Sequence, residues 1–462
     1  MKKQNRVAFF NILSTLLLRG ISIFTSPLFS RLLGTSGYGV TSVYNIWTSA
    51  AAIVLPLQTQ GTLVNARVEY PQEDQEKYQS SVMALSVLSF AVIGGLLLLF
   101  IRPVSSRLQL HWILIPMMLL QAFGIFATSF VGSKFTYEFK AGRNFAMSMG
   151  LTLTNFLLSL VLVLTFPKEH NYFGRILALV LTYGGIGIPC CIYILRRGRT
   201  FYNREYWTFC LTLALPVIFH NLSDLILGQS DRVMLQHMLG DSIVGQYSLA
   251  YTFGNVMFTI FQALNNSWCP FFFEDMKNAR LGQVKQQAKY FLELFTVLSV
   301  GFVLLTNEVF HVYARQDFWA GTSLIPIFVA SYYLNFLCTF PVNFEYYHKK
   351  TKVVAVVTIT SSLINIVLNF FFIRHIGMAG AALATMISHG FQLTMHHAYC
   401  RYSLGKGTYP FGIRLWAKYA AAFFCMVVFV TATEEMAVLR WGLGICIGIW
   451  ELLRIKKRKV LI

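Results

Sequence analysis

The chain has 462 residues, of which 56% are hydrophobic and 12% are charged, and its formal net charge is +19. An ordinary soluble domain contains about 25% charged residues, so this composition excludes a purely water-soluble protein. Apolar runs of roughly 18 residues or more recur along the whole chain, which predicts an all-α integral membrane protein with many spans.

We identify fourteen candidate transmembrane helices in chain order. Their approximate cores are residues 7–30, 38–60, 79–101, 110–132, 145–166, 173–195, 206–229, 242–264, 288–309, 320–341, 353–373, 379–399, 412–432 and 436–453. The first run follows the basic "MKKQNR", but it is too long for a signal peptide and shows no small-residue cleavage site, so we expect it to be a span. The last two spans are separated only by the short "TATEEMAVLR".

Lysine and arginine in the connecting loops predict how the spans are oriented. Counted on alternate sides of the predicted spans, 28 of the 38 Lys and Arg lie on the side of the N-terminus, 9 lie on the other side, and the remaining one is Arg19. By the positive-inside rule, both termini are expected in the cytoplasm. Basic loops beside anionic lipid also account for the net charge, so no nucleic-acid partner is expected.

Two short segments predict an internal repeat. "LGTSGYGVTS" (33–42) lies between spans one and two, and "LGDSIVGQYS" (239–248) lies between spans seven and eight. The two segments share five of ten positions at an offset of 206 residues, which corresponds to six spans. We therefore expect two parallel six-helix halves around a central cavity, residues 1–200 and 201–402, followed by two C-terminal helices and a basic tail in 403–462.

Polar side chains inside the predicted spans indicate the residues of that cavity, because an ionisable group in a span costs roughly 2.5–3.5 kcal/mol on insertion scales. Arg19 lies on one polar face of span one, and His220 and Asp224 share a face of span seven with Pro216, which we expect to act as a hinge. The candidate substrate-cavity residues are Asn11, Thr15, Arg19, Ser22, Ser26, His220, Asn221, Asp224, Asn255, Gln262, Asn266, Asn365, Asn369 and His389.

Structural roles for the same residues stay open. Arg19 could pair with Asp224 and tie the two halves together, and His220 could be a packing histidine. Asparagine and glutamine in spans often join helices by hydrogen bonds. The eight cysteines lie mostly in apolar runs and form no Cys/His cluster, so neither zinc nor another cofactor is expected.

Three segments resemble the Wzx-like polysaccharide flippases of the multidrug/oligosaccharidyl-lipid/polysaccharide exporter superfamily. "SRLLGTSGYG" (30–39) is similar to the first loop of that family, and "ALPVIFHNLSDLILGQSDRVML" (214–235) is similar to its seventh span. The block "KKTKVVAVVTITSSLINIVLNFFFIRHIGMAGAALATMIS" (349–388) closely resembles its spans eleven and twelve. The resemblance extends over nearly the whole chain.

This resemblance implies a flippase that moves a polyprenyl-diphosphate-linked oligosaccharide to the outer leaflet of a bacterial cytoplasmic membrane for cell-surface polysaccharide synthesis. Arg19 is the candidate for the diphosphate contact, because arginine binds phosphate bidentately. A polysaccharide polymerase and glycosyltransferases are the expected partners, beside the lipid-linked oligosaccharide and the bilayer. Which glycan is moved, and the oligomeric state, do not follow from the sequence.

Other functions remain alternatives. "SLGKGT" (403–408) lacks the glycine and the hydroxyl residue of a phosphate loop, so we expect secondary transport, driven by H⁺, Na⁺ or the membrane potential. A peptidoglycan-precursor flippase would also have a cationic cavity, whereas a multidrug or cation antiporter would need an acidic one. A membrane glycan ligase or polymerase would need a large catalytic loop, and the longest outer connection, near residues 314–322, is short.

Overall fold

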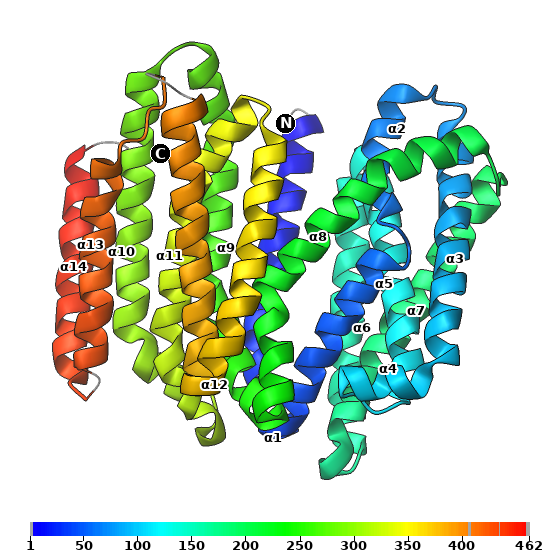
Figure 1. Ribbon diagram of the computed structural model, residues 1–462, viewed down its shortest axis with the longest axis horizontal. Helices are drawn as coiled ribbons and strands as arrows, with labels where there is room; N and C mark the ends of the chain where they lie inside the picture. Colours follow the sequence, from blue (N-terminus) through cyan, green and yellow to red (C-terminus); the bar gives the residue numbers. More distant parts are fainter. Residues whose placement is uncertain (1–2, 405–407, 434, 459–462) are drawn as a thin grey trace. The chain divides into compact units, whose positions relative to one another are not determined.

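The structure is a computed structural model that describes the backbone of residues 3–404, 408–433 and 435–458 (Figure 1). Within these ranges, the side chains of residues 3–22, 141, 415, 452 and 454–458 are not described. Every regular element in the described part of the chain is a helix, so the expected all-α class is confirmed. The chain divides into two compact units, Met1–Gly245 and Gln246–Ile462.

The first unit is a helical bundle whose centre is formed by α5 and α7. Its elements are α1 (Lys3–Val54), η1 (Thr59–Thr62), α2 (Leu63–Glu69), α3 (Gln75–Leu99), α4 (Ile101–Leu108), α5 (Leu114–Tyr137), α6 (Ala141–Thr165), η2 (Lys168–His170), α7 (Asn171–Gly198) and α8 (Arg204–Leu239). α7 packs against α3, α5 and α6, and α1 packs against α5, α6 and α8. α8 begins where the Asn203 side chain accepts a hydrogen bond from the Tyr206 N–H at 3.1 Å, a typical N-cap.

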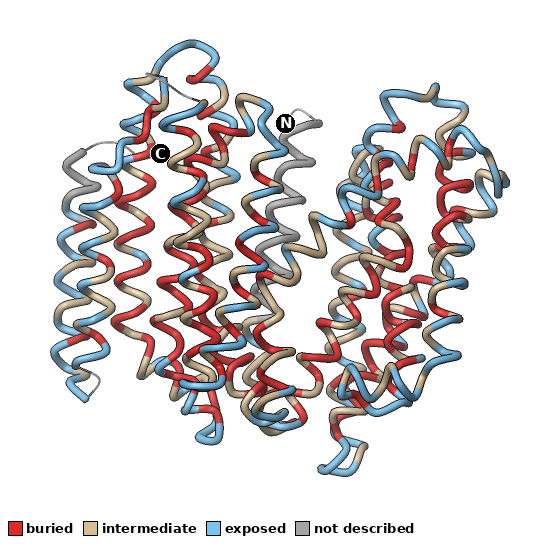
Figure 2. Tube along the Cα trace, in the orientation of Figure 1, coloured by how far each residue is buried: buried red, intermediate tan, exposed pale blue. Residues whose placement is uncertain are grey.

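The second unit is a bundle in which α10 and α11 are the most deeply buried helices (Figure 2). Its elements are α9 (Asp241–Lys277, whose first turn belongs to the first unit), α10 (Leu281–Tyr313), η3 (Gln316–Leu324), α11 (Ile325–Tyr347), α12 (Thr351–Ala398), η4 (Tyr399–Leu404), α13 (Ile413–Ala432) and α14 (Ala437–Arg458). α11 packs against α12, and α10 packs against α13 and α14. A buried pair, His396 Nδ1 and Glu345 Oε1 at 2.9 Å, joins α12 to α11.

The helices follow the order of the predicted spans. α1 and α12 each contain two predicted spans, and their breaks fall at Gly34 and at Ile376–Gly377, within the expected separators. Among the described residues, eight helices are individually long and apolar enough to cross a bilayer, α12 being counted once, and a bent pair, Ile23–Val54 with Thr59–Glu69, is a ninth candidate. Several helices extend beyond the predicted apolar cores, because their ends continue as polar turns in helical geometry.

The two repeated segments adopt the same backbone conformation. Gly34 has φ 68° and ψ 179° inside α1, and Gly240 has φ 87° between α8 and α9, with ψ 171°. This region of conformational space is essentially restricted to glycine. In both places the chain ends one helix, turns at the glycine, and begins the next helix with the residue that follows.

These two helix starts contact each other reciprocally. A Cβ atom placed on Gly39 would lie 1.9 Å from the carbonyl oxygen of Asp241, and one placed on Gly245 would lie 1.9 Å from the carbonyl oxygen of Thr35. Gly39 and Gly245 are equivalent at the offset of 206 residues, and so are Thr35 and Asp241. The Thr35 and Ser242 hydroxyls also lie 2.8 Å apart. The repeated segments therefore form a contact with local two-fold pseudosymmetry.

The boundary of the compact units differs from the division expected for the repeat. α8 packs against α1, α3 and η1, so the first unit includes a helix that the sequence analysis assigned to the second half, 201–402. A compact unit is defined by packing, whereas a repeat half is defined by duplication, so the two boundaries need not coincide. The division into six-helix halves stays a prediction, to which the reciprocal glycine contact adds support.

Candidate functional site

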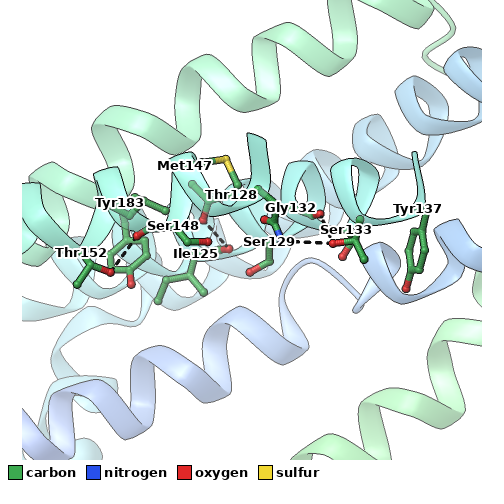
Figure 3. A pocket seen from close by; sticks show the side chains of 13 residues that line it. Ile125, Thr128, Ser129, Gly132, Ser133, Tyr137, Met147, Ser148, Thr152 and Tyr183 are labelled. Carbon is green, nitrogen blue, oxygen red and sulfur yellow. Dashed lines mark hydrogen bonds between the residues drawn. The ribbon is translucent and has the colours of Figure 1, made fainter. Parts of the chain in front are cut away.

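A polar cavity lies in the first unit between α5, α6 and α7 (Figure 3). Its α5 wall carries the hydroxyls of Thr128, Ser129, Ser133 and Thr136. At 100° per residue they fall within an arc of about 140°, so they share one side of the helix. The threonine hydroxyls donate within α5, Thr128 to the Gly124 carbonyl at 2.8 Å and Thr136 to the carbonyl four residues earlier at 3.0 Å. Their lone pairs remain for other donors.

The α6 wall is formed by Asn144, Ser148 and Thr152, which follow one another at intervals of four residues. Asn144 Nδ2 donates to the Thr136 hydroxyl at 3.3 Å and so links this wall to α5. The opposite face of α6 is apolar and exposed, with Leu157 59% accessible. A membrane helix with a lipid-compatible outer face and a half-buried polar face is expected to border a polar cavity.

Close packing of α5 against α7 positions the third wall. A Cβ atom on Gly124 would lie 2.2 Å from the Tyr183 carbonyl oxygen, and one on Gly187 would lie 2.5 Å from the Gly124 Cα. Only glycine allows the two helices to approach this closely. The approach places Tyr183 of α7 beside the hydroxyls of α5 and α6 (Figure 3).

The chemistry of the cavity is neutral and rich in hydroxyls. Its volume is about 460 Å³, and all thirteen residues that line it lack a formal charge at neutral pH. Hydroxyls and an amide can donate to and accept from the hydroxyls of a sugar, and tyrosine rings offer flat faces to its C–H groups. The cavity therefore suits an uncharged polyol better than a cation or a metal ion. In the described part of the chain, no group of three His, Cys, Asp or Glu side chains is arranged to hold a metal.

A second hollow, of about 640 Å³, is lined by charged side chains at the ends of α2, α3, α5 and α7. Lys134, which is 2% exposed, donates to Gln79 Oε1 at 2.5 Å, and its ammonium lies 3.4 Å from Glu138. Burial opposes ionisation of Glu138, but Lys140 and Lys134 outweigh it, so the pKa of this carboxyl lies below its usual value. Arg67 of α2 donates to the carbonyl of Tyr137, a residue that lines the neutral cavity. The two hollows thus share a border at the end of α5.

The predicted residues of span one fall mostly outside the described side chains. Arg19, Asn11, Thr15 and Ser22 belong to this group, so the expected pairing of Arg19 with Asp224 stays a prediction. Ser26 is described and is half-buried in α1.

The predicted residues of span seven are brought together on α8. His220 Nε2 lies 3.5 Å from Asp224 Oδ2, and the two side chains are 42% and 54% exposed. Asn221 is half-buried beside them, and Pro216 lies inside the same helix, one turn before His220. His220 and Asp224 thus lie on one face of α8, as the sequence predicts, and their place in a substrate cavity stays a prediction.

The predicted residues of the second unit lie in two different environments. Asn255 and Gln262 are half-buried on α9, and Asn266 is exposed at the same helix. Asn365 and Asn369 are fully buried on α12, where Asn369 Nδ2 donates to Asn365 Oδ1 at 2.9 Å.

His389 shares that buried environment. Its Nδ1 lies 2.9 Å from the Ser331 hydroxyl of α11. His389, which the sequence suggested as a cavity residue, thus joins α12 to α11 by a hydrogen bond.

The residues of the α5–α7 cavity were not among the sequence candidates. Serine and threonine are nearly neutral in hydropathy, and their hydroxyls are routinely satisfied by the carbonyl one turn earlier, so they do not interrupt an apolar run. A signal was nevertheless present, because Asn144, Ser148 and Thr152 recur at the helical interval of four. The wall can be recognised in the sequence from uncharged polar residues, mostly with hydroxyl groups, that recur once per helical turn.

Comparison with known proteins identifies the family of this chain. A family described as "Polysaccharide biosynthesis protein" matches residues 6–276, more than half of the chain. Two proteins of Haemophilus influenzae are each 24% identical to it. One, described as an uncharacterized membrane protein, aligns over 73% of this chain and 82% of its own length. The other, a protein of the Lsg locus, aligns over 77% of this chain and 88% of its own length.

Solved structures share the fold at low sequence identity. The lipid II flippase MurJ in an inward closed conformation superposes with a TM-score of 0.73 at 16% identity, over 98% of this chain and all of that one. An inward-facing multidrug resistance transporter, described as a MATE family member of the MOP superfamily, gives 0.58 at 12% identity, over 91% of this chain and 95% of its own. The expected exporter-superfamily fold is thereby confirmed.

Proposed function

The chain belongs to the polysaccharide biosynthesis protein family, and from this premise we propose that it is a flippase for a polyprenyl-diphosphate-linked oligosaccharide. The observation that carries the proposal is the neutral, hydroxyl-lined cavity of α5–α7 inside a multi-pass membrane protein of this family. An oligosaccharide crossing a membrane must exchange its hydration for protein hydrogen bonds, because each unsatisfied polar group costs several kcal/mol in hydrocarbon. Ser129, Ser148 and Tyr183 are suited to that exchange.

The proposal extends to the setting of the protein. We infer that the chain acts as a transporter rather than an enzyme, in a bacterial cytoplasmic membrane with both termini in the cytoplasm. A polysaccharide polymerase and glycosyltransferases are the proposed partners. The description of the matching family, which names polysaccharide biosynthesis, supports a role in glycan synthesis.

The residues expected from the sequence keep their proposed roles. Arg19 is the proposed contact for the diphosphate, and the His220–Asp224 pair is the proposed carrier of a coupling ion, H⁺ or Na⁺, because its two groups lie 3.5 Å apart and remain accessible. At matched protein levels, Arg19→Ala should reduce glycan export and Arg19→Lys should reduce it less. Full export by Arg19→Ala would remove Arg19 from the mechanism.

The experiment that tests the function is a translocation assay in proteoliposomes with three labelled substrates. We expect the protein to move a polyprenyl-diphosphate oligosaccharide well above protein-free liposomes, and to move lipid II and a cationic dye less. Preference for lipid II would favour the peptidoglycan-precursor alternative, and preference for the dye would favour the antiporter. A changed covalent structure of the oligosaccharide lipid would instead indicate an enzyme.

A further inference from the structure

The polar face of α6 continues beyond the neutral cavity. Asn144, Ser148 and Thr152 line the cavity, and Asn155 and Ser159 follow on the same face. At 100° and 1.5 Å per residue, the five side chains fall within an arc of about 80° and extend over about 22 Å of helix. We call these five residues the α6 polar row. Such a row on a helix whose other face is apolar extends the polar wall of the cavity along α6 toward α7.

The far end of the α6 polar row holds an arginine of α7. Arg175 Nη1 donates to Asn155 Oδ1 at 3.3 Å and also to the Ser159 hydroxyl. The Ser159 hydroxyl in turn donates to Asn155 Oδ1 at 3.1 Å. The guanidinium lies over the ring of Phe29 from α1, 4.1 Å from its centroid. The plane of the guanidinium is therefore fixed by α1 on one side and by α6 at its edge.

Among the side chains that the structure describes, no carboxylate forms an ion pair with Arg175, whose contacts are an amide oxygen, a hydroxyl and an aromatic ring. Both hydrogen bonds use Nη1, which leaves the donors of Nε and Nη2 for another partner. The residue is half-buried, so part of its surface is accessible. A partly buried charge without a counter-charge is stabilised when a ligand supplies one.

The position of Arg175 relates it to the neutral cavity. Asn155 lies one helical turn beyond Thr152, a distance of about 5 Å along α6. Tyr183, which lines the cavity, lies close enough to Arg175 for electrostatic interaction. Arg175 therefore neighbours the end of the cavity wall that Thr152 forms on α6.

We propose that Arg175 binds a phosphoryl group of a lipid-linked substrate whose sugar occupies the α5–α7 cavity. The inference rests on the proposed function and adds a second cationic contact to the one proposed for Arg19. Arginine presents paired N–H donors that match phosphoryl oxygens, and charge-assisted pairs of this kind are among the strongest hydrogen bonds in proteins. Asn155, Ser159 and Phe29 act as positioning residues that hold the guanidinium in place.

A purely structural role makes a different prediction. If Arg175 only joins α1, α6 and α7, then Phe29→Leu and Arg175→Gln should lower thermal stability alike and leave ligand selectivity unchanged. If it binds phosphate, Arg175→Gln should alter selectivity for phosphorylated ligands whatever its effect on stability. The ratio of two affinities measured on the same sample is insensitive to the fraction of unfolded protein.

The test uses the full chain in nanodiscs and four ligands. They are a polyprenyl-diphosphate hexose, polyprenyl diphosphate without sugar, a polyprenyl glycoside without phosphate, and phosphatidylglycerol as a competitor. Arg102→Gln is the matched control, because it removes the same charge from an exposed position of α4 in the same unit. The Kd ratio of the diphosphate hexose to the phosphate-free glycoside is the quantity of interest.

We expect Arg175→Gln to weaken binding of both diphosphate ligands by about tenfold to a hundredfold and to leave the glycoside within about twofold. Arg175→Lys should recover part of the loss, and Arg102→Gln should match the wild type. An unchanged Kd ratio in Arg175→Gln would overturn the inference, as would displacement of the diphosphate ligands by phosphatidylglycerol at equal concentration, which would indicate a bulk-lipid headgroup site. Binding through Arg175 without translocation in proteoliposomes would overturn the flippase function instead.

Discussion

The helix starts after Gly34 and after Gly240 resemble each other in sequence, in backbone and in the contact they make. Gly39 leaves room for the Asp241 carbonyl, and Gly245 leaves room for the Thr35 carbonyl. At each glycine, the atom that excludes a side chain belongs to the other segment. The requirement for glycine is therefore not visible in either segment alone. The two segments share only five of ten residues, and the shared glycines Gly39 and Gly245 are those that the reciprocal contact requires.

The two helix starts differ in the hydrogen bonds that their side chains form. The Thr35 hydroxyl lies 2.8 Å from the Ser242 hydroxyl, whereas the Asp241 carboxylate accepts from Gln236 Nε2 at 2.8 Å. The Thr35–Ser242 contact therefore holds both starts, and the second start is held in addition by its own preceding helix. The two helix starts have the same backbone conformation at their glycines, but different side-chain hydrogen bonds stabilise them.

The largest loss of stability is expected from adding a methyl group to either glycine of the reciprocal contact. Gly39→Ala and Gly245→Ala should each lower the free energy of unfolding by about 3 kcal/mol, because each new methyl group meets a backbone carbonyl that cannot move away cheaply. Thermal unfolding in detergent, followed by tryptophan fluorescence, measures the change. Gly228→Ala is the control, since a Cβ atom there has no neighbour within 4 Å. Two alanine variants as stable as the wild type would disprove the contact.

A smaller effect is expected at the turning residues themselves. Gly34→Ala and Gly240→Ala should each cost about 1–3 kcal/mol, because an alanine rarely adopts this positive φ with an extended ψ. Open space surrounds both positions, so the cost is conformational only. Equal losses in the same unfolding assay would confirm that the two turns are equivalent. A loss at only one of them would show that the repeated segments differ in backbone strain.

The smallest loss of stability is expected from removing the hydroxyl contact between Thr35 and Ser242. Ser242→Ala removes the hydroxyl contact with Thr35, and we expect it to cost about 0.5–1.5 kcal/mol, typical of one hydrogen bond. Thr35→Val should cost the same, and the double variant should cost no more than either change alone. Additive losses in this double-mutant cycle would mean that the two hydroxyls are not coupled.

Much of the fold follows from hydropathy and from glycine. Apolar runs placed the helices in the correct order, and the separators at residues 31–37 and 374–378 coincide with the breaks at Gly34 and Gly377. Glycine in these separators permits a positive φ, so the chain can turn there without a long loop. The predicted apolar core of α9 ends at residue 264, before the polar Asn265, Asn266 and Ser267, but the helix continues through these residues to Lys277.

The candidate site followed less directly from the sequence. Charged and amide residues are conspicuous in an apolar run, so the sequence predicts His220, Asp224 and Asn365 as cavity residues. Asn365 is buried within the second unit and hydrogen-bonded to Asn369. Arg175 lies only one turn inside α7, so in the count of basic residues on the two sides of the membrane it falls with the nine of the outer side. Its setting over Phe29 depends on the packing of three helices, which no local pattern reveals.

The central claim, that a lipid-linked oligosaccharide passes through the α5–α7 cavity, is tested most directly by filling that cavity. Ser148→Leu places an apolar side chain on its wall, and Leu153→Ala changes the lipid-facing side of the same helix. In proteoliposomes with equal amounts of reconstituted protein, we expect Ser148→Leu to slow translocation of a radiolabelled polyprenyl-diphosphate oligosaccharide at least about tenfold. We expect Leu153→Ala to match the wild type. Wild-type translocation by Ser148→Leu would contradict the claim.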